Sequence, residues 1–337
     1  MSPPKPVVTV LASARGPRPP GLEPVARLAT IRYALSAPSL ARALTETEVL
    51  FIWNFRSASL RDVWPQARRL RWIHVASAGV DAILFPELAS SRVILTNARG
   101  VFDQAIAEYV LGLVLAFAKG FWETLDLQRR RAWRHRETEH VRGQTALIVG
   151  AGGIGRAIGR LAGSAGMRVV AVARTARASD PDLGRVVAVG DLGAVLGEAD
   201  YVIIAAPLTS ETRGLFGAAA FARMKRTARL INVGRGAIVD EAALLRALRS
   251  KRIAGAALDV FSVEPLPTRH PLWDLPGVLV SPHMSGDFAG WAPALSALFV
   301  ENYLRWRRGE PLLNVVDKAL GYVPGAAGES NDRRRLP

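Results

Sequence analysis

The pattern of apolar and polar residues divides the first hundred positions into short apolar runs and longer amphipathic segments. The apolar runs that we expect to form buried strands are VVTVL at 7–11, EVLFIW at 48–53, WIHVA at 72–76 and VILTN at 93–97. Helical stretches such as 22–32 and 58–69 lie between them. Strands that alternate with helices in this way indicate a parallel sheet with crossover helices.

A long helical segment at 103–131 separates this region from a second alternating region. It begins with Asp103 at a plausible N-cap and ends in basic residues, which suit the C-terminal end of a helix dipole. The second set of apolar runs is TALIVG at 145–150, MRVVAVA at 167–173, YVIIAA at 201–206, RLINVG at 229–234, GAALDV at 255–260 and GVLVSP at 277–282. Six strands at this spacing are what one doubly wound sheet requires. We expect a final helix over 290–308 and a frayed tail at 321–337.

Length and composition restrict the class of protein. A chain of 337 residues favours two domains, and a composition that is 50% hydrophobic and 22% charged indicates a globular protein. The absence of cysteine excludes disulfides, thiolate metal sites and cysteine nucleophiles, and the five scattered histidines leave no metal site to expect. The first twenty residues contain no apolar run of signal-peptide length, and the longest apolar run, 105–118, contains Glu108. We therefore expect a soluble, cytoplasmic protein without a membrane partner.

The net charge of +15 is compatible with a polyanionic partner. However, the arginines are spread along the chain, and the dense clusters are confined to 129–136 and 333–335. This distribution favours a solvated, arginine-rich surface over a nucleic-acid site. An anionic small substrate or cofactor is compatible with either interpretation.

The segment from Gly150 to Gly155 fits the pattern G-x-G-x-x-G. It follows the apolar strand TALIV and opens a helical stretch, which is the context that makes this common pattern specific for dinucleotide binding. Gly150 permits the tight turn, Gly152 lets backbone N–H groups approach a pyrophosphate, and Gly155 allows close packing of helix on strand. We place Gly153 and Ile154, at the start of the helix, in the same cofactor site. The alternative is a glycine-rich turn without a ligand.

Three strand ends in the second region carry polar side chains suited to chemistry. Arg235 follows the strand at 229–234, Asp259 and Glu264 follow the strand at 255–260, and His283 follows the strand at 277–282. Because ligands bind beyond the carboxyl ends of parallel strands, these side chains are expected at one sheet edge. A fixed cation, a proton donor and a supporting carboxylate are the groups needed to move a hydride and a proton. Each residue taken alone has an ordinary structural interpretation.

The combination of motifs resembles the D-isomer-specific 2-hydroxyacid dehydrogenases over about residues 48–317. The resemblance rests on TNARGVFDQAIAEYVLG, VGAGGIGR, AAPLTSETRGLF, INVGRGAIVDEAAL, ALDVFSVEPLP and SPHMSG. It implies an α/β fold of two Rossmann-like, doubly wound domains. The discontinuous substrate domain would comprise 1–102 and 291–320, and the inserted dinucleotide-binding domain, with the linking helix, would comprise 103–290.

The same resemblance implies a role for each matching residue. Arg235 would hold the substrate carboxylate and carbonyl oxygen, and His283 would act as general acid in reduction and as base in oxidation. Glu264 would hold the imidazole and favour its charged form. Asp259 would hydrogen-bond the nicotinamide carboxamide. The loop residues expected to face the substrate carboxylate are Ser77, Ala78 and Gly79, and the further residues expected at the cofactor are Pro207, Thr212, Val233, Gly234 and Ser285.

The strand after the glycine loop departs from the pattern of NAD-using relatives. Ala173 stands where those relatives place the acid that contacts the ribose, and Arg174, Thr175 and Arg177 follow it. An arginine at this position accommodates a 2′-phosphate. The sequence therefore predicts a preference for NADPH, with NADH also usable, although Arg174 could be an ordinary surface arginine.

Two functions remain open at this point. The first is a dehydrogenase that acts, as a reductase, on a small 2-keto acid such as glyoxylate or hydroxypyruvate. The second is a dinucleotide-sensing regulator resembling the C-terminal-binding corepressors. The lack of a long disordered interaction tail beyond the short terminus favours the enzyme. The resemblance also implies a homodimer with the helix from Asp103 at the contact. Trp291 belongs either to a core or interface or to the wall of the substrate pocket.

Overall fold

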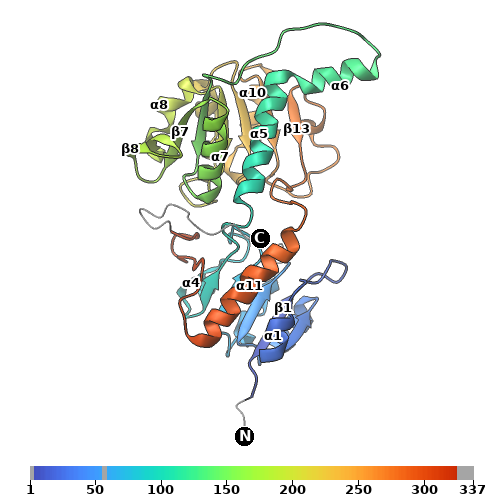
Figure 1. The fold of residues 1–337 in the computed structure, drawn as a ribbon, viewed down its shortest axis with the longest axis vertical. Coiled ribbons are helices and arrows are strands. Elements are labelled where there is room, and N and C mark those ends of the chain that lie inside the picture. Colours follow the sequence, from blue (N-terminus) through green and yellow to red (C-terminus); the bar gives the residue numbers. More distant parts are fainter. Residues whose placement is uncertain (1–3, 55–58, 325–337) are drawn as a thin grey trace. The chain divides into compact units, whose positions relative to one another are not determined.

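The computed structural model describes residues 4–54 and 59–324, and the chain forms two compact units (Figure 1). Unit 1 comprises Met1–Val101 and Ala289–Pro337, and unit 2 comprises Phe102–Phe288. At the two boundaries between the units, these limits lie one or two residues from the domain limits expected from the sequence. Of the tail expected at 321–337, residues 325–337 lie outside the described residues. Residues 321–324 form a turn in which the Asp317 N–H donates to the Tyr322 carbonyl at 3.1 Å.

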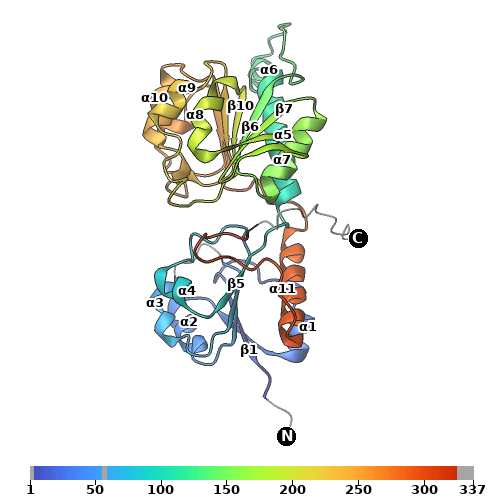
Figure 2. The ribbon, with the colours of Figure 1, turned by 90° about the vertical axis from the view of Figure 1, so that its left-hand side faces the viewer.

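Unit 1 contains a five-stranded parallel sheet in the order β2-β1-β3-β4-β5. Its strands are β1 (Val7–Leu11), β2 (Thr30–Ala34), β3 (Val49–Ile52), β4 (Trp72–Val75) and β5 (Ile94–Thr96). Its helices are α1 (Glu23–Leu28), α2 (Ala37–Leu44), α3 (Ser59–Asp62), α4 (Pro86–Ser90) and α11 (Trp291–Arg308). Figure 2 shows α2, α3 and α4 on one face of this sheet and α1 and α11 on the other. Helix α11, near the C-terminal end of the described residues, thus covers one face of a sheet that the first hundred residues form.

The core beneath α11 is aromatic. The ring of Phe299 stacks on Phe51 at 4.1 Å between centroids and on Trp72 at 5.5 Å, and all three side chains are fully buried. His74 lies among these rings, and burial lowers its pKa to about 3. Its Nδ1 lies 2.8 Å from the Thr96 hydroxyl, so the imidazole is held neutral inside the core.

Two expectations for unit 1 were wrong. The helix expected over 22–32 ends at Leu28, and Thr30–Ala34 forms β2, because Thr30, Ile31 and Tyr33 are β-branched or aromatic residues that favour a strand. The helix expected over 58–69 is reduced to α3 and a 3₁₀ turn at Trp64–Gln66, where Pro65 interrupts the backbone hydrogen bonding.

Unit 2 contains an eight-stranded sheet in the order β13-β12-β11-β10-β6-β7-β9-β8. Its strands are β6 (Thr145–Val149), β7 (Arg168–Ala173), β8 (Arg177–Asp180), β9 (Gly184–Ala188), β10 (Tyr201–Ile204), β11 (Arg229–Asn232), β12 (Gly255–Leu258) and β13 (Val278–Val280). Its helices are α5 (Asp103–Lys119), α6 (Phe121–Arg129), α7 (Gly153–Ser164), α8 (Leu192–Val195), α9 (Ala218–Arg223) and α10 (Glu241–Arg249). Helices α8, α9 and α10 cover one face and α5 and α7 the other, each over its own apolar core.

Two further expectations were wrong in unit 2. The single helix expected over 103–131 is two helices, α5 and α6, which bend by 63° where Gly120 adopts a left-handed conformation with φ +60°. The sheet has eight strands instead of six, because β9 joins β7 in parallel and β8 pairs with β9 in antiparallel orientation. The residues of β8 (RASD) are mostly polar, so no apolar run predicted this strand.

Among the described helices, none is by itself long and apolar enough to cross a membrane. Only α5 and α6 taken together reach that length and composition, and the bend at Gly120 separates them.

Candidate active site

The glycine loop joins β6 to α7 and leaves space for a ligand. Gly150 has φ +116°, and a Cβ there would lie 2.7 Å from the backbone of Ala205 and Ala206. A Cβ on Gly155 would overlap the carbonyl of Gly150, so the helix lies directly against the strand end. At Gly152, by contrast, a Cβ would meet no described atom within 4 Å.

The N-terminus of α7 therefore faces open space at the loop. Its N-cap is Gly152, which has no side chain to cap the helix. Gly153 begins the helix beside the carboxylate of Asp103, and Ile154 is half-buried behind it. A helix N-terminus preceded by a glycine with open space around it can hold a pyrophosphate, so these residues fit a dinucleotide.

The end of β7 presents basic side chains. Arg174 and Thr175 are exposed directly after the strand, and Arg177 begins β8. Arg177 lies 3.5 Å from the carboxylate of Asp180, which also accepts two hydrogen bonds from Arg156 at 2.8 and 2.9 Å. Burial opposes ionisation of Asp180, but the hydrogen bonds and charge of Arg156 hold the pKa of this carboxyl below its ordinary value. The first acid after β7 is thus held in ion pairs within unit 2.

Two loops beside the glycine loop are fixed by their own side chains. The Thr212 hydroxyl donates to the Pro207 carbonyl at 2.7 Å and thereby closes the turn after β10. After β11, the buried amide of Asn232 accepts from the Gly234 N–H at 3.1 Å and donates to the Arg235 carbonyl at 3.1 Å. Val233 is buried between these contacts. The backbone that carries Arg235 is therefore held on both sides.

The side chains of Arg235, Glu264 and His283 follow β11, β12 and β13, which are neighbours in the sheet. His283 Nδ1 lies 2.8 Å from Glu264 Oε2, and the side chains are 31% and 25% exposed. The Phe261 N–H donates to Glu264 Oε1 at 3.0 Å and orients the carboxylate. Arg235 Nη1 donates to the carbonyl of its neighbour Gly234 at 2.8 Å.

The backbone of His283 is in the left-handed region, with φ +56°. A residue other than glycine adopts this conformation only where the surroundings impose it. Asp259 supplies that constraint, because its buried carboxylate accepts from the Met284 and Ser285 N–H groups at 2.9 Å each. It also accepts from the Ser281 hydroxyl at 2.7 Å. The structure thus shows Asp259 as an anchor of the His283 loop.

Tyr109 on α5 is a member of this network that sequence reasoning missed. Burial raises the pKa of its hydroxyl, a hydrogen bond with Ser281 acts in the opposite direction, and the charge of Asp259 raises it further. Within the sequence, Tyr109 belongs to the apolar pattern of a helix, so only its position in a recognised motif could have indicated a polar contact.

The expected substrate loop belongs to unit 1 and follows the carboxyl end of β4. The Ser77 hydroxyl donates to the Gly79 carbonyl at 2.6 Å, and Asn97 donates to the Ala78 carbonyl. Across residues 4–54 and 59–324, the backbone N–H groups of Ala78 and Gly79 donate to no protein acceptor. Consecutive N–H groups without a protein acceptor are suited to binding an anion.

Trp291, whose place the sequence left open, begins α11 in unit 1. Its ring stacks on Trp53 at 5.8 Å with an interplanar angle of 15°. The indole N–H of Trp53 donates to the Pro17 carbonyl at 2.9 Å. Among the described histidines and acids, no group of three or more is placed to hold a metal ion.

Comparison with known proteins identifies similar chains. A family model described as D-isomer specific 2-hydroxyacid dehydrogenase, NAD binding domain, matches residues 111–285. The chain is 35% identical to a glyoxylate reductase of Aeropyrum pernix over 77% of its own length and 80% of that protein. An NADPH-dependent glyoxylate/hydroxypyruvate reductase from Sinorhizobium meliloti, solved with NADP and sulfate, has a TM-score of 0.80 at 27% identity, covering 94% of this chain and 100% of that one. A D-isomer specific 2-hydroxyacid dehydrogenase from Xanthobacter autotrophicus, solved with NADPH and MES, has a TM-score of 0.77 at 30% identity, covering 94% and 99%.

Proposed function

We propose that this chain, which belongs to the D-isomer-specific 2-hydroxyacid dehydrogenase family, reduces a small 2-keto acid such as glyoxylate or hydroxypyruvate with NADPH. Membership of this family establishes the general reaction. The protein is an enzyme that transfers a hydride between a nicotinamide dinucleotide and a 2-hydroxy acid. The direction, the size of the substrate and the choice of NADPH form the proposal, and a chiral product, such as that formed from hydroxypyruvate, would be the D-isomer.

The observation that carries the proposal is the 2.8 Å contact between His283 Nδ1 and Glu264 Oε2 beside Arg235. A carboxylate on Nδ1 fixes the tautomer and orientation of the imidazole and leaves Nε2 to face a ligand. When bound, the reduced nicotinamide supplies the hydride that adds to the keto carbon. His283 Nε2 donates the proton that the carbonyl oxygen gains, and Glu264 stabilises the charged imidazole before this transfer.

Arg235 and the substrate loop would bind the negative charge of the substrate. A guanidinium can hold a carboxylate and the adjacent carbonyl oxygen through parallel N–H groups, which positions the keto carbon for attack. The N–H groups of Ala78 and Gly79, which lack protein acceptors in the described structure, suit the carboxylate. These groups support a 2-keto acid over an uncharged ketone.

The preference for NADPH rests on the residues after β7. Arg174 and Thr175 are exposed where the ribose 2′-substituent of a bound dinucleotide is held in this fold. Asp180, which could repel a phosphate, has its charge compensated by Arg156 and Arg177. Support also comes from the two similar structures, of which one contains NADP and the other NADPH.

Steady-state kinetics with a panel of 2-keto acids and both cofactors test this proposal. We expect kcat/KM to be higher with NADPH than with NADH. Arg174→Ala should lower the ratio of the two kcat/KM values about tenfold, because it removes one charge-assisted hydrogen bond to the 2′-phosphate. Arg249→Ala, which removes an exposed arginine at the end of α10, is the matched control and leaves the ratio unchanged. Equal values for the two cofactors in the wild type, or no activity on any 2-keto acid, contradict the proposal.

We further propose a homodimer that involves α5 and α6. Phe121 and Leu125 are half-exposed on one face of α6, and Trp133, in the segment after it, is fully exposed. Large apolar side chains exposed together indicate an interface. Light scattering is expected to give twice the chain mass of 36.3 kDa, and a monomer mass rejects the dimer.

A further inference from the structure

Unit 1 contains a cavity of about 640 Å³ at the amino ends of β4 and β5. Its lining comes from the segments before these strands, from the 3₁₀ turn at Trp64–Gln66 and from α11. The loop of Ser77 and Gly79 follows the carboxyl end of β4, so the cavity lies at the opposite edge of the sheet from that loop. The proposed substrate groups therefore do not account for it.

Three arginines give the cavity a strong positive charge. Arg68, Arg71 and Arg92 line it and are exposed, and no carboxylate of the described residues lies within 4.0 Å of any of them. Elsewhere in the chain, arginines such as Arg32 and Arg156 pair with acids. Because no carboxylate of the described residues compensates these guanidinium groups, an anionic ligand would be attracted to them.

The ammonium group of the half-buried Lys318 lies beside the cavity. Lys318 Nζ donates to the carbonyls of Ser91 and Val93 at 2.6 and 3.0 Å, and both residues line the cavity. Because its partners are neutral carbonyls, no carboxylate cancels its charge. Lys318 thus places a fourth cationic side chain next to the three arginines that line the cavity.

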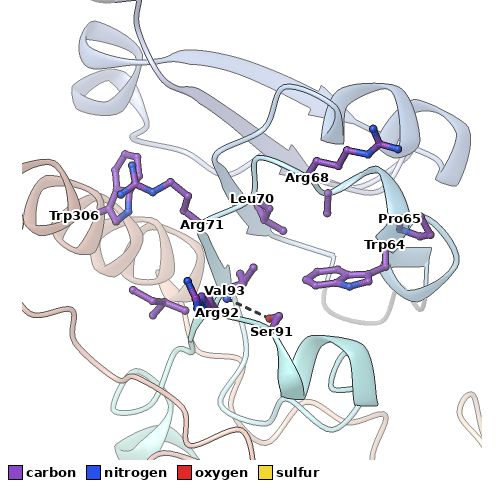
Figure 3. Close-up of a pocket in the computed structure, with 11 residues that line it drawn as sticks. Trp64, Pro65, Arg68, Leu70, Arg71, Ser91, Arg92, Val93 and Trp306 are labelled. Atoms are coloured by element: carbon purple, nitrogen blue, oxygen red, sulfur yellow. Dashed lines mark hydrogen bonds between the residues drawn. The ribbon is translucent and has the colours of Figure 1, made fainter.

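Two indole rings limit the cavity. Figure 3 shows Trp306 at one end and Trp64 at the other, with Leu70 and Val93 between them. The guanidinium of Arg71 lies over the Trp306 ring, 5.5 Å from its centroid, so its position is set by stacking. A stacked guanidinium keeps its N–H groups available in its own plane. The cavity thus combines guanidinium groups with indole rings.

We propose that this cavity is a second small-molecule site, which binds an aryl phosphate of the nucleotide type. The phosphate would lie between Arg71 and Arg92, and the aromatic ring would stack on an indole and cover Leu70 and Val93. The volume lies within the range of about 300–1,000 Å³ that is typical of small-molecule sites. Because an indole lies at each end of the cavity (Figure 3), a compact ligand fits better than a continuous nucleic-acid strand, which would extend beyond both indoles.

Calorimetric titration of the full chain tests the proposal, with 1-naphthyl phosphate, inorganic phosphate and 1-naphthol as probes. We expect the ester to bind more tightly than either fragment, because only the ester offers both charge and ring. Arg71→Ala and Arg92→Ala should each weaken ester binding at least about tenfold by removing a hydrogen bond to a charged group. Arg69→Ala is the matched control, since Arg69 is an exposed neighbour that does not line the cavity.

Each other result rejects the proposal. Ester affinity that is equal in the wild type and in both cavity variants would mean that the probe binds elsewhere, for example at the glycine loop. Phosphate that binds as tightly as the ester excludes a role for the indoles. If a single-stranded oligonucleotide binds and loses affinity in the same variants while the ester does not bind, the site is a nucleic-acid site. Unchanged NADPH-dependent reduction in both variants verifies folding and keeps this test separate from that of the proposed function.

Discussion

Replacement of Asp259 by asparagine tests how the His283 loop is held. The carboxylate accepts three hydrogen bonds on two oxygens: the Ser281 hydroxyl and the Met284 N–H on Oδ1, and the Ser285 N–H on Oδ2. An asparagine of the same shape keeps one oxygen and replaces the other with an NH₂ group. If the oxygen stays at Oδ1, the NH₂ group faces the Ser285 N–H, and two donors oppose each other in a buried site.

The magnitude follows from these contacts. A buried N–H that loses its acceptor costs about 1–3 kcal/mol, and the two remaining hydrogen bonds lose the assistance of a charge, which adds about 1 kcal/mol. The expected loss is therefore about 2–4 kcal/mol, or about 5–15 °C in Tm. His283 also loses the constraint that holds it at φ +56°, and a displacement of about 1 Å in a reacting group lowers kcat about 100-fold.

Differential scanning calorimetry and steady-state kinetics measure the two effects. Asp240→Asn is the matched control, because Asp240 caps α10 by accepting from the Ala243 N–H at 3.0 Å, and asparagine caps equally well. We expect that control to retain wild-type Tm and kcat. Wild-type values in Asp259→Asn would refute the anchoring role.

His283→Ala should lower kcat by about two to four decades while dinucleotide affinity, measured by fluorescence, persists; near-normal turnover removes His283 as the proton donor. Arg235→Lys should lower kcat/KM strongly for 2-keto acids, because an ammonium cannot replace the paired N–H groups of a guanidinium. Equal reduction of 2-keto acids and uncharged ketones by the wild type argues against this role of Arg235. Since the pKa of His74 falls from 6.5 to about 3 on folding, the unfolded chain takes up the proton first, and stability decreases as pH falls below 6.5. Acidification from pH 6 to 4 should thus cost about 2.5 kcal/mol in urea unfolding, and His74→Gln should lose that part of the slope; an unchanged slope in the variant contradicts the buried neutral imidazole.

The apolar runs predicted ten of the thirteen strands found in the described residues, since parallel strands buried on both faces are nearly continuous in hydrophobicity. The three exceptions have physical reasons. β2 and β8 are edge strands with exposed positions, and β9 follows β8 in a region of mixed polarity. The break between α5 and α6 depends on one glycine inside an otherwise helical pattern, where glycine is also tolerated.

The part of the candidate site that lies directly after strand ends could be predicted from the sequence. Arg235, Glu264 and His283 each come shortly after an apolar run, so the sheet topology alone places them at one edge. The contacts of Asp259 with Ser281 and Ser285 were not predictable, because they join residues 22 to 26 positions apart through the geometry of a loop. The cavity between Trp64 and Trp306 depends on the return of the last helix to the first sheet, which no local pattern encodes.

That return has a consequence for biosynthesis. Phe299 of α11 packs on Phe51 and Trp72, and Tyr303 packs on Phe299, yet both leave the ribosome about 200 residues after Val101. At a translation rate of about 5–20 residues per second, the aromatic face of the nascent sheet stays uncovered for roughly 10–40 s. During this time the inserted unit is translated and can fold first. In this interval the nascent chain is most vulnerable to aggregation and most dependent on chaperones.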